Sequence, residues 1–160
     1  MRSRPLRSAT VTEKTTLLRF LRAQRESVLA ILDGLGEEAL TKAVLPSGWT
    51  PLGMVEHLGD AERHWFQEIV AGAADPGGPP AKRPEAVFAY YRRQCRRSDE
   101  IVAATPLSAP LRGRHPGPFG DEITDLRAVV LHLIEETARH AGHLDVAREL
   151  LDGRTGLGPR

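Results

Sequence analysis

The stretch EETARHAGHLD, residues 135–145, lies in the middle of a pattern that is typical of a long helix. Apolar residues at helical spacing around it mark the face expected to be buried, namely Val129, Leu133, Leu144, Ala147 and Leu151. At about 100° per residue, Glu136, His140 and His143 are expected on or beside that face, and His132 at its edge. An ionised carboxylate buried without a partner is costly, so Glu136 is expected to be protonated, paired or bound to a metal.

Two interpretations of these three side chains are open. The first is a hydrogen-bonded cluster in which Glu136 pairs with His140 or with an arginine. The second is a metal site, because residues four apart place two ligands on successive turns of one helix face. The chain has a single cysteine, Cys95, and no CxxC motif, so a metal site must use histidines and carboxylates.

Helical patterns also precede this stretch, and glycine or proline ends each of them. Together they predict four amphipathic helices, over residues 10–33, 51–71, 84–105 and 125–151. Thr10 with Glu13, Thr50 with Pro51, and Thr124 are the expected N-terminal capping signals. A short turn is expected around residues 37–40.

The segments between these helices predict how the chain is organised. Residues 72–84 and 105–122 are rich in glycine and proline and are expected to be loops. No segment shows strand alternation, so the predicted fold class is all-α, a four-helix bundle in one domain over residues 10–152. Residues 1–9 are expected to form a flexible arm and residues 153–160 a flexible tail.

A third metal ligand would have to come from another helix, and the second helix offers two histidines. His57 and His64 lie seven residues apart on nearly the same line; His57 flanks the apolar arc and His64 lies further toward solvent. Either could instead be an exposed histidine. His115, between glycines and prolines, is expected to be solvated.

Composition limits the classes of partner. The net charge is +1, with 22 basic and 21 acidic residues, so no overall field favours nucleic acid or an anionic membrane. No apolar run approaches the roughly 20 residues of a membrane span. The basic N-terminus is followed by no apolar segment of the kind that a secretory signal contains, so a cytoplasmic protein is expected.

Two stretches together resemble the DinB-like superfamily of metal-binding four-helix bundles. They are SGWTPLGMVEHLGDAERHWF, residues 47–66, and HLIEETARHAGHLD, residues 132–145. This superfamily includes bacillithiol and mycothiol S-transferases and the mycothiol-dependent maleylpyruvate isomerase. The resemblance extends from about Thr12 to Leu151.

The resemblance implies a metal site. The histidine in VEHL, His57, matches the ligand that the superfamily carries in its second helix, and His140 matches the second histidine of its HxxxH motif. Glutamate, Glu136, stands in the first position of that motif, which is similar to the isomerase branch. His143 stands where glutamine is common, so either Glu136 or His143 completes the site. The implied metal is Zn²⁺, with Ni²⁺ as the other candidate.

The activity that the resemblance implies is transfer of a low-molecular-weight thiol, such as mycothiol or bacillithiol, to a small electrophilic substrate. His143 and His64 are the candidates for proton transfer in that reaction. The alternatives are an amidase-like hydrolase that uses zinc-bound hydroxide, and a non-catalytic metal-binding stress-response protein. The family also implies a homodimer.

Overall fold

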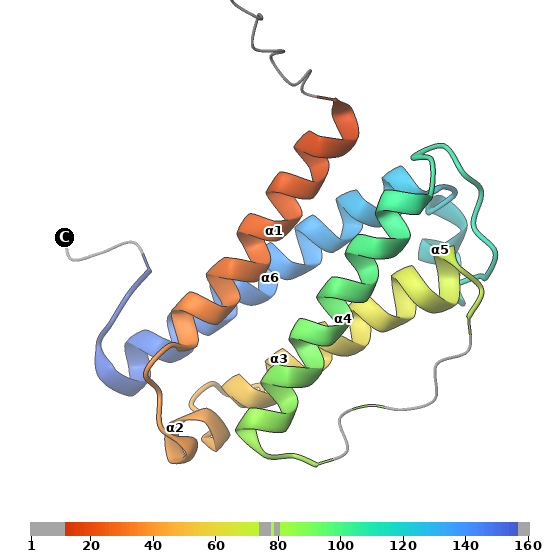
Figure 1. The fold of residues 1–160 in the computed structure, drawn as a ribbon. Coiled ribbons are helices and arrows are strands. Elements are labelled where there is room, and N and C mark those ends of the chain that lie inside the picture. Colours follow the sequence, from red (N-terminus) through yellow and green to blue (C-terminus); the bar gives the residue numbers. More distant parts are fainter. Residues whose placement is uncertain (1–11, 74–77, 79–80, 157–160) are drawn as a thin grey trace, which may run out of the picture.

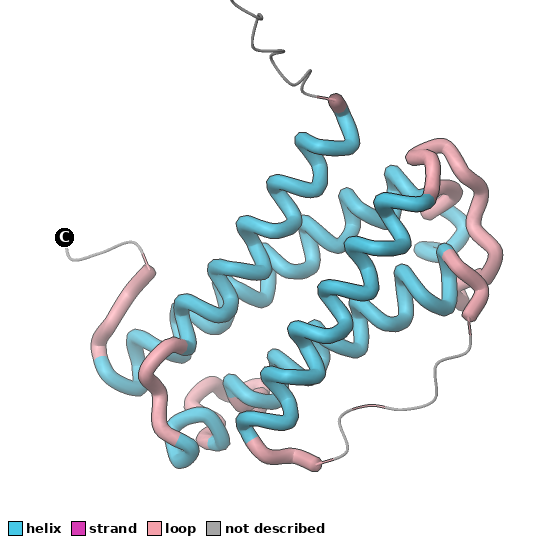
Figure 2. The backbone as a smooth tube through the Cα atoms, viewed as in Figure 1, coloured by secondary structure: helices cyan, strands magenta, loops and turns pink. Residues whose placement is uncertain are grey.

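The computed structural model describes residues 12–73, 78 and 81–156. Its elements are α1 (Glu13–Leu32), α2 (Glu37–Thr41), α3 (Pro51–Glu62), the π-helical segment η1 (Arg63–Val70), α4 (Pro84–Ala104), α5 (Pro118–Glu122) and α6 (Leu126–Asp152). Among the described residues there is no strand, only an isolated bridge between Pro110 and Asp125. The prediction of an all-α four-helix bundle is confirmed, with α1, α3–η1, α4 and α6 as its long helices (Figures 1 and 2).

The bundle consists of two closely packed helix pairs. α1 packs chiefly against α6, and α3 chiefly against α4, while α3 and η1 also contact α6. The apolar core is divided into two clusters along the helices. One includes Val28, Leu58 and Leu144, and the other includes Leu21, Trp65 and Leu133. Two buried charged residues, Arg25 on α1 and Glu62 at the end of α3, lie between these clusters.

Helix capping differs from the prediction at two of three positions. Thr50 caps α3 as expected, because its side chain accepts a hydrogen bond from the backbone N–H of Gly53. Thr10 lies outside the described residues, and α1 is capped by Thr12 instead. Asp125, not Thr124, caps α6, since its carboxylate accepts from Ala128 N. Several good capping residues stand side by side in both segments, so the sequence marks the helix start only to within two residues.

Two segments differ in secondary structure from the prediction. The predicted loop over residues 105–122 contains the short helix α5, and the predicted second helix becomes a π-helix over its last two turns. The expected N-terminal arm lies outside the described residues. In the expected tail, Gly156 N donates to Asp145 Oδ1 at 3.1 Å, so the described part of this segment contacts α6.

One close contact between α3 and α4 depends on glycine. A Cβ atom at Gly59 would lie 2.7 Å from Cε1 of Tyr90, whose side chain is fully buried. We expect Gly59→Ala to lower the free energy of unfolding by about 1–3 kcal/mol, because the Tyr90 ring has no free space to enter. Gly142 is the matched control: a Cβ there meets nothing within 4 Å, so Gly142→Ala should stabilise the helix by up to about 1 kcal/mol. Urea denaturation measures both, and equal effects of the two substitutions would contradict this account.

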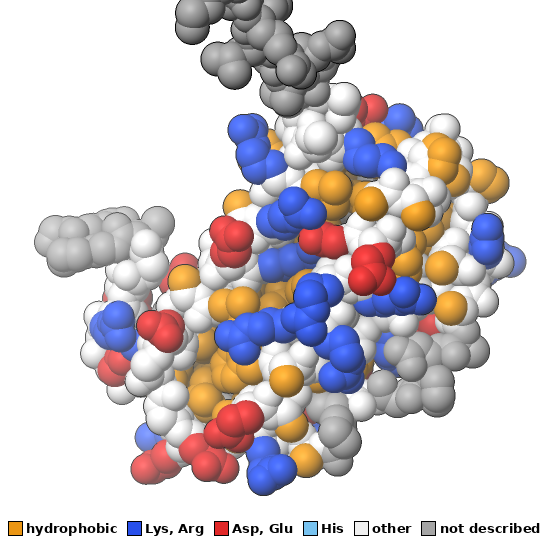
Figure 3. Space-filling model, in the orientation of Figure 1, with side chains coloured by type: hydrophobic (Ala, Val, Ile, Leu, Met, Phe, Trp, Pro, Cys, Tyr) orange, Lys and Arg blue, Asp and Glu red, His pale blue; other side chains and the backbone are white. Residues whose placement is uncertain are grey.

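The face formed by α1 and α4 carries many basic side chains with acidic side chains among them (Figure 3). One of the ion pairs between these helices joins Arg22 Nη2 to Asp99 Oδ2 at 2.9 Å. Mixed charges of this kind give no single-sign field over the face. None of the helices in the described part of the chain is long and apolar enough to cross a membrane.

Candidate metal centre

Three of the predicted site residues meet where α3 crosses α6. His57 lies in the second turn of α3, and Glu136 and His140 lie on successive turns of α6. Oε1 of Glu136 is 3.1 Å from Nε2 of His57 and 3.0 Å from Nε2 of His140. The carboxylate thus contacts both imidazoles, and residues 79 positions apart in sequence share one site.

These three side chains offer a suitable set of donor atoms for a metal. One ligand atom from each of His57, Glu136 and His140 lies within 4.8 Å of the other two. The side chains of Glu136 and His140 are 18% and 13% exposed, and that of His57 is 36% exposed. Two nitrogens and one carboxylate oxygen in a partly open position are typical of a catalytic zinc site, whereas structural zinc sites are closed by four protein ligands.

The electrostatics of the site also fit a divalent cation. Hydrogen bonds from His140 and then from His57 hold the pKa of Glu136 well below its usual value, although burial opposes this. Glu136 is therefore ionised throughout the neutral range and needs a compensating positive charge in its partly buried position. Nδ1 of His140 is buried without a hydrogen-bond partner among the described residues, so Nε2, which contacts Glu136, is the only nitrogen of this ring in a polar contact.

His143 lies outside this group. Its ring centroid is 5.8 Å from that of His140, but the side chain is exposed. The expectation that His143 lies on the buried stripe of α6 is wrong. The buried face also includes Thr137 and Arg148, which a pattern of apolar residues does not count, and their burial shifts the centre of the face away from His143. Arg148 is buried because its guanidinium donates to the carbonyl oxygens of Ile31 and Asp33 at the end of α1.

Trp49 borders the open side of the site. It precedes the N-cap of α3, is 45% exposed, and has its ring centroid 5.5 Å from that of His57. Trp49 was not predictable from the sequence, because a tryptophan before a helix start carries no pattern that links it to a distant metal ligand. Trp49 therefore adds an exposed aromatic surface next to His57.

A second group of imidazoles lies further along the same helices. His64 is hydrogen-bonded to His115, whose ring stacks on Trp65 with centroids 4.8 Å apart. His132 packs edge-on against Trp65 on the same side of the bundle. The prediction that His115 is solvated holds only in part: the side chain is half-buried, because the loop that carries it folds back onto η1. The sequence gives no spacing that joins His64 to a residue 51 positions later.

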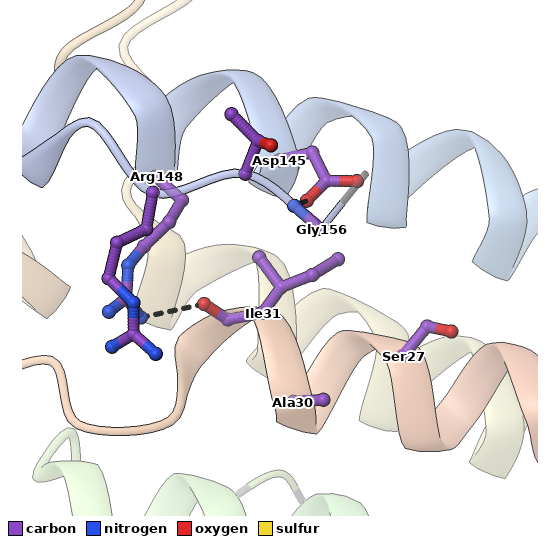
Figure 4. Close-up of a pocket in the computed structure, with 8 residues that line it drawn as sticks. Ser27, Ala30, Ile31, Asp145, Arg148 and Gly156 are labelled. Atoms are coloured by element: carbon purple, nitrogen blue, oxygen red, sulfur yellow. Dashed lines mark hydrogen bonds between the residues drawn. The ribbon is translucent and has the colours of Figure 1, made fainter. Parts of the chain in front are cut away.

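The pocket drawn in Figure 4 lies elsewhere, between α1, the end of α6 and residues 154–156, and has a volume of about 360 Å³. Arg148 projects into it, but its guanidinium is already bonded to Ile31 O, Asp33 O and the carboxylate of Asp152. None of the three candidate metal ligands lines this pocket. This pocket is therefore separate from the candidate metal centre.

Comparison with known proteins identifies a family. No curated protein and no solved structure matches the chain. The family model for mycothiol-S-transferase matches residues 16–153, a range that contains all four long helices apart from the first turn of α1, together with the three candidate ligands. The chain therefore belongs to the mycothiol-S-transferase family, within the DinB-like superfamily.

Proposed function

We propose that this protein is a zinc-dependent transferase that joins a low-molecular-weight thiol, mycothiol in the first instance, to a small electrophilic substrate. The observation that carries the proposal is the convergence of His57, Glu136 and His140 in a member of the mycothiol-S-transferase family. Nickel is the other metal that these donors suit.

In this proposal each residue of the site has a defined role. His57, Glu136 and His140 would hold the metal, with Trp49 beside His57. A metal bound there would supply Lewis acidity, which lowers the pKa of a thiol ligand and makes thiolate available at neutral pH. Trp49 would offer an apolar surface beside that position, and His143, which is exposed, would contact the thiol or the substrate and not the metal.

The chain's only cysteine does not compete as the nucleophile. Burial, and then the nearby carboxylate of Glu62, raises the pKa of Cys95 well above its usual value. A thiol in that state is almost entirely protonated at neutral pH and is unreactive. The nucleophilic sulfur therefore comes from a small molecule, which agrees with the family to which the chain belongs.

A turnover assay with defined components tests the proposal. Purified protein is stripped of metal, reloaded with Zn²⁺ or Ni²⁺, and supplied with mycothiol, bacillithiol or glutathione and monochlorobimane. We expect a fluorescent conjugate to form only when both metal and thiol are present, and elemental analysis to give one metal per chain.

Other outcomes identify the alternatives. Turnover of amide substrates without any thiol would identify an amidase-like hydrolase instead. A stably bound metal with neither thiol binding nor turnover would identify a non-catalytic metal-binding protein. Either result would replace the transferase proposal.

A further inference from the structure

A hydrogen-bonded chain of three titratable side chains lies outside the metal ligands. Nδ1 of His64 is 2.7 Å from Oε2 of Glu68, and Nε2 of His64 is 2.9 Å from Nδ1 of His115. No described residue bonds to the remaining nitrogen, Nε2 of His115. The chain thus runs from a carboxylate on η1 through two imidazoles and ends at a free ring nitrogen.

Hydrogen-bond chemistry fixes the direction of this chain. A carboxylate only accepts, so Nδ1 of His64 donates to Glu68. Nε2 of neutral His64 is then an acceptor, and Nδ1 of His115 donates to it. Nε2 of His115 is left with its lone pair free. When Nε2 of His115 takes up a proton, the Nδ1 proton can move to His64, which places the positive charge next to Glu68.

The loop that carries His115 is held tightly against η1. Backbone N–H groups of Arg112 and Gly113 both donate to the carbonyl oxygen of Ile69, at 3.0 and 2.8 Å. A Cβ at Gly113 would lie 2.5 Å from Glu68 O, so only glycine permits this approach. The Trp65 ring stacks on the His115 ring, with an angle of 22° between the two ring planes. The position of His115 is therefore defined by backbone bonds and by stacking.

The helix beneath the chain is unusual at the same residues. His64, Trp65 and Glu68 all lie in η1, the eight-residue π-helical segment. π-helical turns are rare in proteins as a whole, and a large share of those that occur lie at functional sites. Here the wider turn also brings the guanidinium of Arg63 to the other oxygen of Glu68, which keeps the carboxylate oriented.

The hydrogen-bonded residues Glu68, His64 and His115 lie near the candidate metal centre along the same helices. His64 follows His57 by seven residues, a rise of about 10 Å along the helix, and His132 precedes Glu136 by one turn. His132 packs against Trp65, with ring centroids 4.7 Å apart, so on α6 the second group begins one turn before Glu136.

We propose that Glu68, His64 and His115 form a proton relay ending at Nε2 of His115, which serves the reaction at the neighbouring site. This proposal rests on the proposed function. The thiol releases its proton to solvent on ionising, and the relay takes up a proton from solvent at Nε2 of His115. When sulfur bonds to the β-carbon of an enone, the electron pair of the C=C bond moves toward the carbonyl to give an enolate, and the relay donates its proton to that enolate. Where chloride leaves with the electron pair of the C–Cl bond, the substrate takes up no proton and the relay is not used. Thiol and electrophile are the only reactants.

The charges around the relay agree with this role. Burial, and then the neighbouring His64, lowers the pKa of His115, so its resting state is neutral and able to accept a proton. The titratable and charged groups around the relay are Arg63 on η1, Arg114 beside His115 in the loop, and His132 on α6. Burial also lowers the pKa of His132, so this ring adds no positive charge at neutral pH.

A first test needs no turnover. Nitrogen-15 spectra of the histidine side chains in the full-length zinc-loaded protein should show His64 and His115 both protonated at Nδ1 at neutral pH. Glu68→Gln should lower the pH at which the pair takes up a proton, because a negative charge is removed. The matched control Glu100→Gln, on an exposed residue of α4, should not. A His115 ring protonated at Nε2 at neutral pH, or no response to Glu68→Gln, would overturn the relay.

The second test compares two electrophiles with one thiol. Chloride leaves monochlorobimane without a proton, whereas the enolate formed from 2-cyclohexenone must be protonated. His115→Gln should lower kcat for cyclohexenone by about a hundredfold, the usual size of a general acid–base contribution, with a changed pH profile. Its rate with monochlorobimane, KM for the thiol and metal content should stay within a few-fold of wild type.

Glu68→Gln and His64→Gln should show the same pattern to a smaller degree, since both act through His115. Equal losses with both electrophiles, or none with either, would overturn the relay while leaving the transferase function standing. A wild-type protein inactive with both would instead overturn the proposed function, and the nitrogen-15 spectra would still decide whether the relay exists.

Discussion

The His140→Ala variant is expected to bind no zinc at concentrations that saturate the wild type. His140 is the least exposed of the three candidate ligands, and Nε2 is its only engaged nitrogen. Its loss leaves Glu136 and His57, and two ligands do not form a stable zinc site in a protein. Elemental analysis after dialysis measures the metal content, and circular dichroism confirms that the bundle remains folded. Zinc retained at wild-type stoichiometry would contradict the assignment.

Two conservative variants separate the roles of the other α6 residues. Glu136→Gln keeps the shape of the side chain but removes the charge, and an amide is a poorer zinc ligand than a carboxylate. We expect it to lose most of the zinc affinity. Removing a group that orients a metal ligand lowers metal affinity by about ten- to a hundredfold. His143 is exposed and, within the described part of the chain, forms no hydrogen bond to a candidate ligand, so His143→Gln should change the zinc affinity less than about tenfold. The reverse order would make His143 the ligand and Glu136 a partner of an imidazole.

The fold was predictable because its signals are local. Each long helix repeats apolar residues at helical spacing and is followed by a glycine or proline, and Thr50 with Pro51 marks a start that the structure confirms. Errors arose where neighbouring residues compete for one role, as at the caps of α1 and α6. No local sequence pattern marks the π-helical turn of η1, whose Ile69 carbonyl accepts hydrogen bonds from the distant residues Arg112 and Gly113.

The candidate metal centre was predictable for a different reason. A glutamate and a histidine near an apolar stripe indicate a site, and the family resemblance supplied the distant partner, His57. The imidazole group around His115 was not predictable, because its members meet only through tertiary structure. His143 was misplaced because burial of the polar residues Thr137 and Arg148 cannot be inferred from an apolar pattern.

A further large effect is expected in the interior, where a buried ion pair separates the two apolar clusters. Nε and Nη2 of Arg25 each bond to one oxygen of Glu62 at 2.7 Å, and both residues are at most 5% exposed. Arg25→Met should lower the free energy of unfolding by about 3–5 kcal/mol, because Glu62 would remain buried without its partner. Urea denaturation of the variant and the wild type measures this difference.

Two further variants show whether the pair itself stabilises the fold. Arg22 is 55% exposed and also bonds Asp99, so Arg22→Met is a matched control and should cost at most about 1 kcal/mol. The double variant Arg25→Met/Glu62→Leu removes both charges, and its stability should return to near the wild-type value or above it, since apolar side chains of similar volume avoid the desolvation of two ions. A double variant as unstable as the single one would mean that the pair is needed to align the two halves of the core. In that case the polar level between the clusters fixes how α1 and α3 pack, and with it the position of His57 opposite Glu136.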